Sequence, residues 1–208
     1  DLGSGPENRL PIKQLKALGC EVIVIDHHPV DPEVDELVDL HVNPHLFDAP
    51  NELSAGILCA EVGRMINKDA QMVDIIAAVS SISDRVEADY AAPYLAIAEE
   101  KGFNREKLTD IVSSLEFIVY HLRTLEANGL LDILFGENAI RRDSLLEIHK
   151  AEIARRSAIV IAQAEQILRI EKIGNTNVLY LPVDQMLIKD NYPRMGIIID
   201  IVKEHMMT

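Results

Sequence analysis

The feature that most constrains this chain is a run of apolar residues that ends abruptly in a carboxylate and two imidazoles. In the stretch VIVIDHHPV, residues 22–30, four apolar residues stand directly before Asp26, His27 and His28. A short, continuous apolar run of this kind predicts a strand that is buried on both faces of a parallel sheet. Ligands bind beyond the carboxyl ends of the strands in open parallel sheets, so this end of the strand is a candidate site.

The segments on either side of this strand predict the fold class. Residues 9–19 have apolar side chains on one helical face and end at a glycine, and residues 39–43 are typical of a second short strand. A helix that leads straight into a buried strand indicates an α/β unit. We therefore expect an α/β fold built on a parallel sheet.

The rest of the chain is predicted to be mostly helical. Ser54 is a suitable N-cap, Gly129 is a suitable helix stop, and Pro193 suits the first turn of a helix. The predicted helices cover residues 55–67, 71–83, 90–100, 104–127, 138–172 and 193–205, and a strand is predicted at 177–183.

This pattern predicts three parts of the chain. Residues 1–137 form the parallel-sheet α/β domain with its helical region, and residues 138–173 form a long connector helix. Helices longer than about 25 residues usually bridge domains or coil around a partner. Residues 174–208 then begin a second, incomplete α/β domain.

Charge and cysteine content limit the possible functions. The formal net charge of −14 argues against a broad surface for nucleic acid, because phosphate binding depends on Lys and Arg. The same charge is compatible with a cation site. No apolar run reaches the roughly 18 residues of a membrane span. Cys20 and Cys59 form no CxxC pair and are predicted to be buried free thiols in a reducing cytoplasm.

Two further carboxylates stand beside predicted helices. Asp1 opens DLGSGPEN before the first helix, and Asp84 closes SSISD after the 71–83 helix. Carboxylates combined with imidazoles suit Mn²⁺, and carboxylates with water suit Mg²⁺. Two such ions about 3.5–4 Å apart are a known device for phosphoester hydrolysis. The alternative is that each aspartate is an ordinary cap or turn residue. His41 and His45 could both approach this site, but we predict that they are solvated loop residues.

Three of these stretches, in this order, resemble motifs of the DHH phosphoesterase superfamily. DLGS at 1–4 is similar to its second motif, VIVIDHH at 22–28 to its third, and SSISD at 80–84 to its fourth. NP at 43–44 and SAGILCAEV at 54–62 resemble the segment that follows DHH in archaeal RecJ-like exonucleases. Beyond about residue 90 the likeness concerns only the order of the helices and strands.

The resemblance implies a role for each motif residue. Asp1 matches a carboxylate that bridges two metal ions, and His27 and Asp84 match metal ligands. His28 matches a residue that contacts the scissile phosphate. Asp26 would orient an imidazole, as metal-bound histidines usually require.

Three more residues are candidate substrate contacts. Ser54 and Gly56 open a helix whose N-terminal amides could meet a phosphate, although a plain helix cap is the alternative. Arg85 follows Asp84 and could contact a phosphate or form a salt bridge.

The function implied is metal-dependent phosphodiester hydrolysis by a RecJ-like exonuclease on single-stranded DNA or RNA, in the cytoplasm, with Mn²⁺ or Mg²⁺ and with replication or repair proteins as partners. One alternative is a phosphoesterase for short oligoribonucleotides, cyclic dinucleotides or pyrophosphate. Another is an inactive scaffold of a replication complex. The first motif of the superfamily and most of its DHH-associated domain have no match here, so we expect the chain alone to be inactive.

Overall fold

The computed structural model of the chain describes residues 3–47, 53–70, 72–86, 88–122, 127–188 and 192–207. It divides into two compact units, Asp1–Val112 (unit 1) and Ser113–Thr208 (unit 2), which are described separately. The division into compact units does not test the predicted domain limits at residues 137 and 173, which stay predictions.

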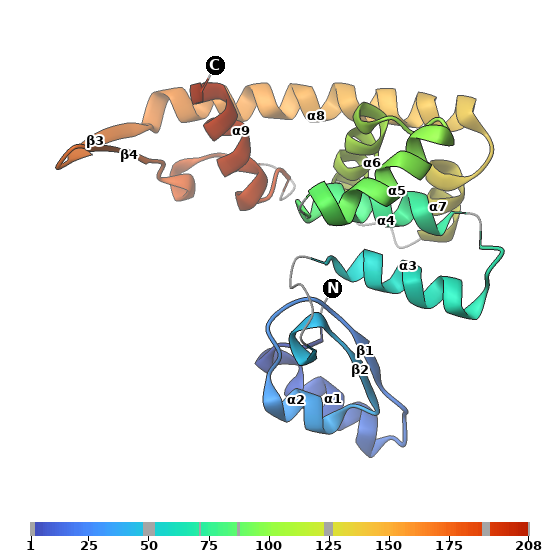
Figure 1. Ribbon diagram of the computed structural model, residues 1–208. Coiled ribbons are helices and arrows are strands. Elements are labelled where there is room, and N and C mark those ends of the chain that lie inside the picture. Colours follow the sequence, from blue (N-terminus) through green and yellow to red (C-terminus); the bar gives the residue numbers. More distant parts are fainter. Residues whose placement is uncertain are drawn as a thin grey trace. The chain divides into compact units, whose positions relative to one another are not determined.

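Unit 1 begins with the predicted α/β element. Its parts are η1 (Pro6–Asn8), α1 (Arg9–Ala17), β1 (Ile23–Ile25), α2 (Pro32–Leu37), β2 (Leu40–Val42) and η2 (Pro44–Leu46). The strands β1 and β2 pair in parallel, with Val24 opposite His41 and Ile25 opposite Val42 (Figure 1). The mixed α/β fold with a parallel sheet is therefore confirmed.

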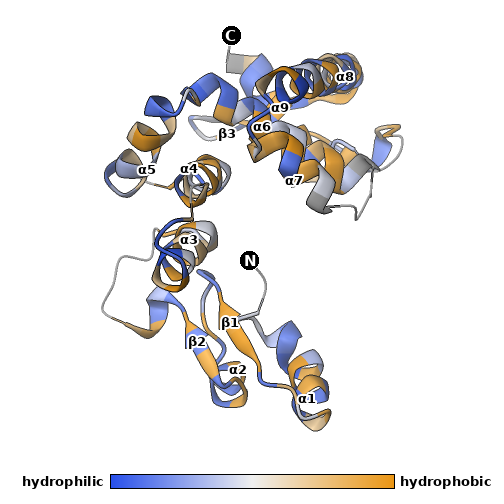
Figure 2. Ribbon diagram, turned by 90° about the vertical axis from the view of Figure 1, so that its right-hand side faces the viewer, coloured by the Kyte–Doolittle hydropathy of each residue, from blue (hydrophilic) through white to orange (hydrophobic). Residues whose placement is uncertain are grey.

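One face of this two-stranded sheet is covered by helices. Ile12 of α1 and Val34 of α2 pack with Val22 and Val24 in one buried cluster. The other face is open: Ile23 is 62% exposed and its partner Leu40 is 52% exposed. The prediction that the strand is buried on both faces is thus wrong for the described residues, because α1 and α2 both pack on the Val24 side. Figure 2 shows β1 largely in the apolar colour.

The second part of unit 1 is helical. It contains α3 (Ala55–Ile66), α4 (Val73–Ser83), α5 (Ala88–Glu100) and the start of α6 (Arg105–Phe117). Ser54 caps α3 as predicted, since its Oγ accepts a hydrogen bond from the Ile57 N–H. Gly56 allows α3 to approach α4, because a Cβ there would lie 2.3 Å from the Cβ of Ser80.

Unit 2 contains the end of α6, the π-helix η3 (Ile118–Leu122), α7 (Ala127–Phe135), α8 (Ala139–Ile167), β3 (Arg169–Ile173), β4 (Thr176–Tyr180), η4 (Val183–Gln185) and α9 (Met195–Met207). Its core joins α8 to α9 through Val160, Ala164, Ile198 and Val202.

Two boundaries in unit 2 differ from the prediction. Helix α7 continues through Gly129, which is therefore not a stop. Helix α8 ends at Ile167 rather than 172, because residues 169–173 pair as β3 with β4. Gly174 makes the turn between these strands with φ of +63°, a conformation that favours glycine.

The prediction that the two cysteines are buried is wrong: Cys20 and Cys59 are free thiols, as predicted, but both are exposed. Cys20 follows the end of α1, and Cys59 lies on an outward-facing position of α3. Among the described helices, none has the length and apolar character that crossing a membrane requires.

Candidate metal and phosphate site

Asp26 is a buried carboxylate at the end of β1. Its N–H donates to the Val42 carbonyl at 3.1 Å, which continues the parallel pairing by one residue. Its side chain is 1% exposed and accepts hydrogen bonds from the N–H groups of Ser4 at 3.0 Å and His27 at 2.8 Å. The Nδ1 atom of His28 lies 2.9 Å from the same carboxylate.

These contacts decide the charge of Asp26. Burial acts to raise the pKa of its carboxyl, but the hydrogen bonds from His28, Ser4 and His27 outweigh burial and hold that pKa well below its usual range. Asp26 is therefore ionised. An ionised carboxylate only accepts hydrogen bonds, so Nδ1 of His28 carries a proton, and Nε2 is the ring nitrogen left to face a ligand.

The two imidazoles meet at an open edge of unit 1. Their ring centroids are 4.5 Å apart with an interplanar angle of 65°. Asp26, His27 and His28 each offer one ligand atom, and these atoms all lie within 4.8 Å of one another. Among the described residues, these are the three side chains that could together hold a metal ion, because their donor atoms lie this close to one another. A carboxylate with two imidazoles fits a divalent cation such as Mn²⁺.

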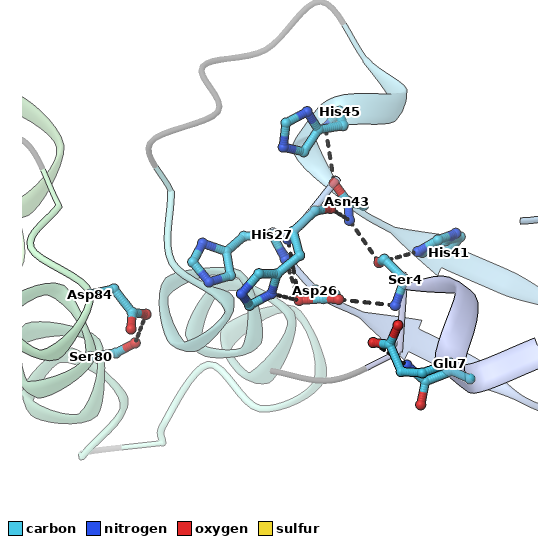
Figure 3. A network of polar contacts seen from close by, with 11 residues as sticks. Ser4, Glu7, Asp26, His27, His41, Asn43, His45, Ser80 and Asp84 are labelled. Atoms are coloured by element: carbon cyan, nitrogen blue, oxygen red, sulfur yellow. Dashed lines mark hydrogen bonds and ion pairs between the residues drawn. The ribbon is translucent and has the colours of Figure 1, made fainter. Parts of the chain in front are cut away.

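Of the other predicted metal ligands, Asp84 alone is among the described residues, and it does not join this group. Asp84 is the C-cap of α4, and Ser80 Oγ lies 3.4 Å from its Oδ2. In the view of Figure 3 the Asp84 carboxylate is on the side of His27, but it is not among the atoms that meet within 4.8 Å. Asp1 lies outside the described residues.

The predicted substrate contacts have structural roles. Ser54 is fully buried, caps α3 and accepts a hydrogen bond from Ser80 Oγ at 2.9 Å. Gly56 is needed for the packing of α3 on α4. Arg85 is exposed with φ of +55° and borders a cavity of about 410 Å³ that Arg105 also lines. Roles for these residues in phosphate binding stay predictions.

A polar network behind Asp26, buried except at Asp35, is absent from the predicted site. It consists of Ser4, Asp35, His41 and Asn43 (Figure 3 labels all but Asp35). The prediction that His41 is a solvated loop residue is wrong, since His41 lies on β2 and is only 9% exposed, whereas His45 is exposed. The period of two along Leu40–Val42 would by itself have placed the apolar Leu40 and Val42 inward and His41 outward, so no local signal indicates that His41 is buried.

Comparison with known proteins bears on the fold. No family model matches the chain. The chain is 32% identical to the uncharacterized protein MJ1198 of Methanocaldococcus jannaschii over 94% of its own length and 29% of that protein. It superposes with a TM-score of 0.89, at 28% identity, on a solved structure described as the DHH domain of a member of the s1p family of ribosomal proteins.

That match includes 98% of this chain and 49% of the solved one. The chain thus spans less than a third of the curated relative and about half of the solved structure. Its α/β fold is the fold of that solved DHH domain.

Proposed function

We propose that the chain belongs to a divalent-metal-dependent phosphoesterase that acts as a RecJ-like exonuclease on single-stranded DNA or RNA. The observation that carries this proposal is the meeting of Asp26, His27 and His28 within 4.8 Å at the carboxyl end of a parallel strand. The likeness of the fold to a DHH domain supports it.

In this proposal Asp26, His27 and His28 have different roles. Asp26, buried and ionised, orients His28 through Nδ1. His27 is a metal ligand, and His28, as an imidazolium held by the Asp26 carboxylate, donates from Nε2 to a phosphate oxygen. A bound Mn²⁺ or Mg²⁺ supplies an activated water at neutral pH and neutralises charge on the phosphate.

The remaining predicted residues complete the proposed site. Asp1 and Asp84 are further metal ligands, and Arg85 contacts the phosphate. Ser54 is fully buried, so its part and that of Gly56 are limited to the amides at the start of α3. Replication or repair proteins in the cytoplasm are the partners that this activity implies.

Substitution of His28 tests the proposal. The protein at its full natural length is given end-labelled single-stranded DNA or RNA with Mn²⁺. His28→Ala should lower the turnover rate at least about a hundredfold, the scale of a lost hydrogen-bond donor to the developing charge. The His28 side chain is 54% exposed, so the fold should be retained. His45→Ala is the matched control, since His45 is also exposed. Wild-type turnover by the His28→Ala variant would refute the proposal.

One observation favours a smaller substrate for the same site. The formal net charge of −14 repels a long polyanion more than a short one. Comparing turnover of a long single strand with that of a dinucleotide distinguishes the two. Faster turnover of the dinucleotide at every salt concentration would favour the short-substrate alternative.

A further inference from the structure

A polar network that is buried except at Asp35 lies directly behind the Asp26–His28 edge. The Ser4 side chain is fully buried, and its Oγ lies 2.9 Å from His41 Nε2 and 2.9 Å from Asn43 Nδ2. On its other side the His41 ring places Nδ1 2.9 Å from Asp35 Oδ1. The carboxylate, imidazole, hydroxyl and amide thus form one continuous chain of contacts.

The chemistry of these groups allows one arrangement of protons. The Asp35 carboxylate only accepts, so His41 Nδ1 carries the proton and Nε2 accepts. The Ser4 hydroxyl then donates to Nε2, and its oxygen accepts from the Asn43 amide. In the opposite tautomer the Nδ1 lone pair would face the Asp35 carboxylate oxygen, and both His41 and Asn43 would donate to Ser4.

Two routes connect this network to His28. In the first, the Ser4 N–H donates to Asp26 at 3.0 Å, and Asp26 holds His28 Nδ1 at 2.9 Å. In the second, Asn43 Nδ2 donates to the His28 carbonyl at 3.0 Å. The Ser4 backbone is also held from behind, because its carbonyl accepts from the Asp31 N–H at 2.8 Å. Both the ring and the backbone of His28 are thus tied to Ser4.

The series Ser4, His41 and Asp35 has the connectivity of a nucleophile, a base and an orienting carboxylate. The full burial of Ser4 excludes a nucleophilic role, because its hydroxyl cannot reach a substrate. Its oxygen is also occupied by Asn43. The network therefore acts on the site through position rather than by bond formation.

We propose that His41, oriented by Asp35, is a positioning residue for the Asp26–His28 pair. By fixing the Ser4 hydroxyl it fixes Asn43 and the Ser4 amide, which hold the backbone and the ring of His28. This role rests on the proposed metal and phosphate site, since it concerns the orientation of the His28 ring at that site. Outer hydrogen bonds of this kind commonly affect metal affinity or activity about 10- to 100-fold.

The test uses the protein at its full natural length with two changes in the network. Asp35→Ala removes an acceptor whose side chain is 41% exposed, so folding should survive. His41→Phe removes the ring nitrogens from a buried position. His41→Gln keeps an acceptor near the Ser4 hydroxyl and is the rescue variant. His45→Ala is the control, four residues along the chain.

Three measurements are compared among these variants: ring ¹⁵N signals of His28 and His41 without metal, Mn²⁺ affinity by calorimetry, and kcat against KM. We expect Asp35→Ala and His41→Phe to move the His28 signals and weaken Mn²⁺ binding about tenfold or more. The kcat should fall while KM changes little. His41→Gln should recover part of the loss, and His45→Ala should match the wild type.

The ring ¹⁵N signals of His28 test the positioning role independently of the proposed function, because they are measured without metal or substrate. If His28→Ala retains full turnover, the proposed function fails, while a shifted His28 signal in Asp35→Ala still supports the network. If both network variants keep the wild-type His28 signal and Mn²⁺ affinity, the positioning role is wrong even where hydrolysis is confirmed. Should His41→Phe unfold, Asp35→Ala and His41→Gln decide by the same signals.

Discussion

Each compact unit contains a buried histidine bonded to a buried serine, and the two pairs differ in what lies beyond them. In unit 1, His41 bonds Ser4 and also Asp35, and Ser4 continues through its amide to Asp26. In unit 2, His149 Nδ1 bonds Ser114, and its ring packs 5.0 Å from that of Phe117.

The difference shows that a Ser–His pair by itself does not indicate chemistry. His149 and Ser114 are 6% and 1% exposed and join helices α8 and α6, which is the role of a satisfied polar contact in a core. The pair in unit 1 is one step in a chain of contacts that ends at exposed His28. The two Ser–His pairs therefore differ in that only the pair in unit 1 is shown to be connected to an exposed side chain, that of His28.

Removing the central acceptor of unit 1 should have the largest effect. Asp26→Ala leaves the N–H groups of Ser4 and His27 without their acceptor and releases His28. We expect Mn²⁺ affinity to fall at least about a hundredfold and unit 1 to lose about 2–5 kcal/mol of stability. Calorimetry and urea unfolding measure the two. Unchanged Mn²⁺ affinity would remove Asp26 from the site.

The corresponding change in unit 2 should affect stability alone. His149→Phe leaves the buried Ser114 hydroxyl without its ring partner, which costs about 1–2 kcal/mol. Mn²⁺ affinity and turnover should equal those of the wild type, in contrast to His41→Phe. A loss of Mn²⁺ affinity in His149→Phe would break the distinction between the two pairs.

The pH dependence of stability gives a further contrast. Burial lowers the pKa of His149 below its ordinary value, so the unfolded chain takes up a proton at a higher pH than the folded one. The stabilising contribution of the neutral ring is complete above about pH 6.5 and is lost as pH falls from there toward the folded pKa. Unfolding of unit 2 followed at pH 7.5 and 5.5 should show this loss, and His149→Phe should reduce it.

The smallest expected effect concerns Asp84. Ser80 Oγ donates to Ser54 Oγ at 2.9 Å and lies 3.4 Å from Asp84 Oδ2, which is a long contact. Ser80→Ala should therefore cost no more than about 1 kcal/mol and change Mn²⁺ affinity by less than threefold. A larger loss of affinity would show that Ser80 orients Asp84 toward the cation.

Local patterns in the sequence account for much of the fold. The apolar run before Asp26 predicts β1 and places Asp26, His27 and His28 at its carboxyl end, as the structure has them. The N-cap at Ser54 and the span of α4 also follow from local signals, because capping and helical periodicity involve neighbouring residues.

What the tertiary structure alone decided is which faces and side chains are enclosed. Ile23 is exposed and His41 buried because α1 and α2 pack on one side of the β1–β2 pair, and a strand's own residues cannot say which side that is. Helix α8 ends at Ile167 because β3 finds β4 as a partner. The network from Asp35 to His28 joins residues up to 39 positions apart, so only the folded chain brings them into hydrogen-bond distance.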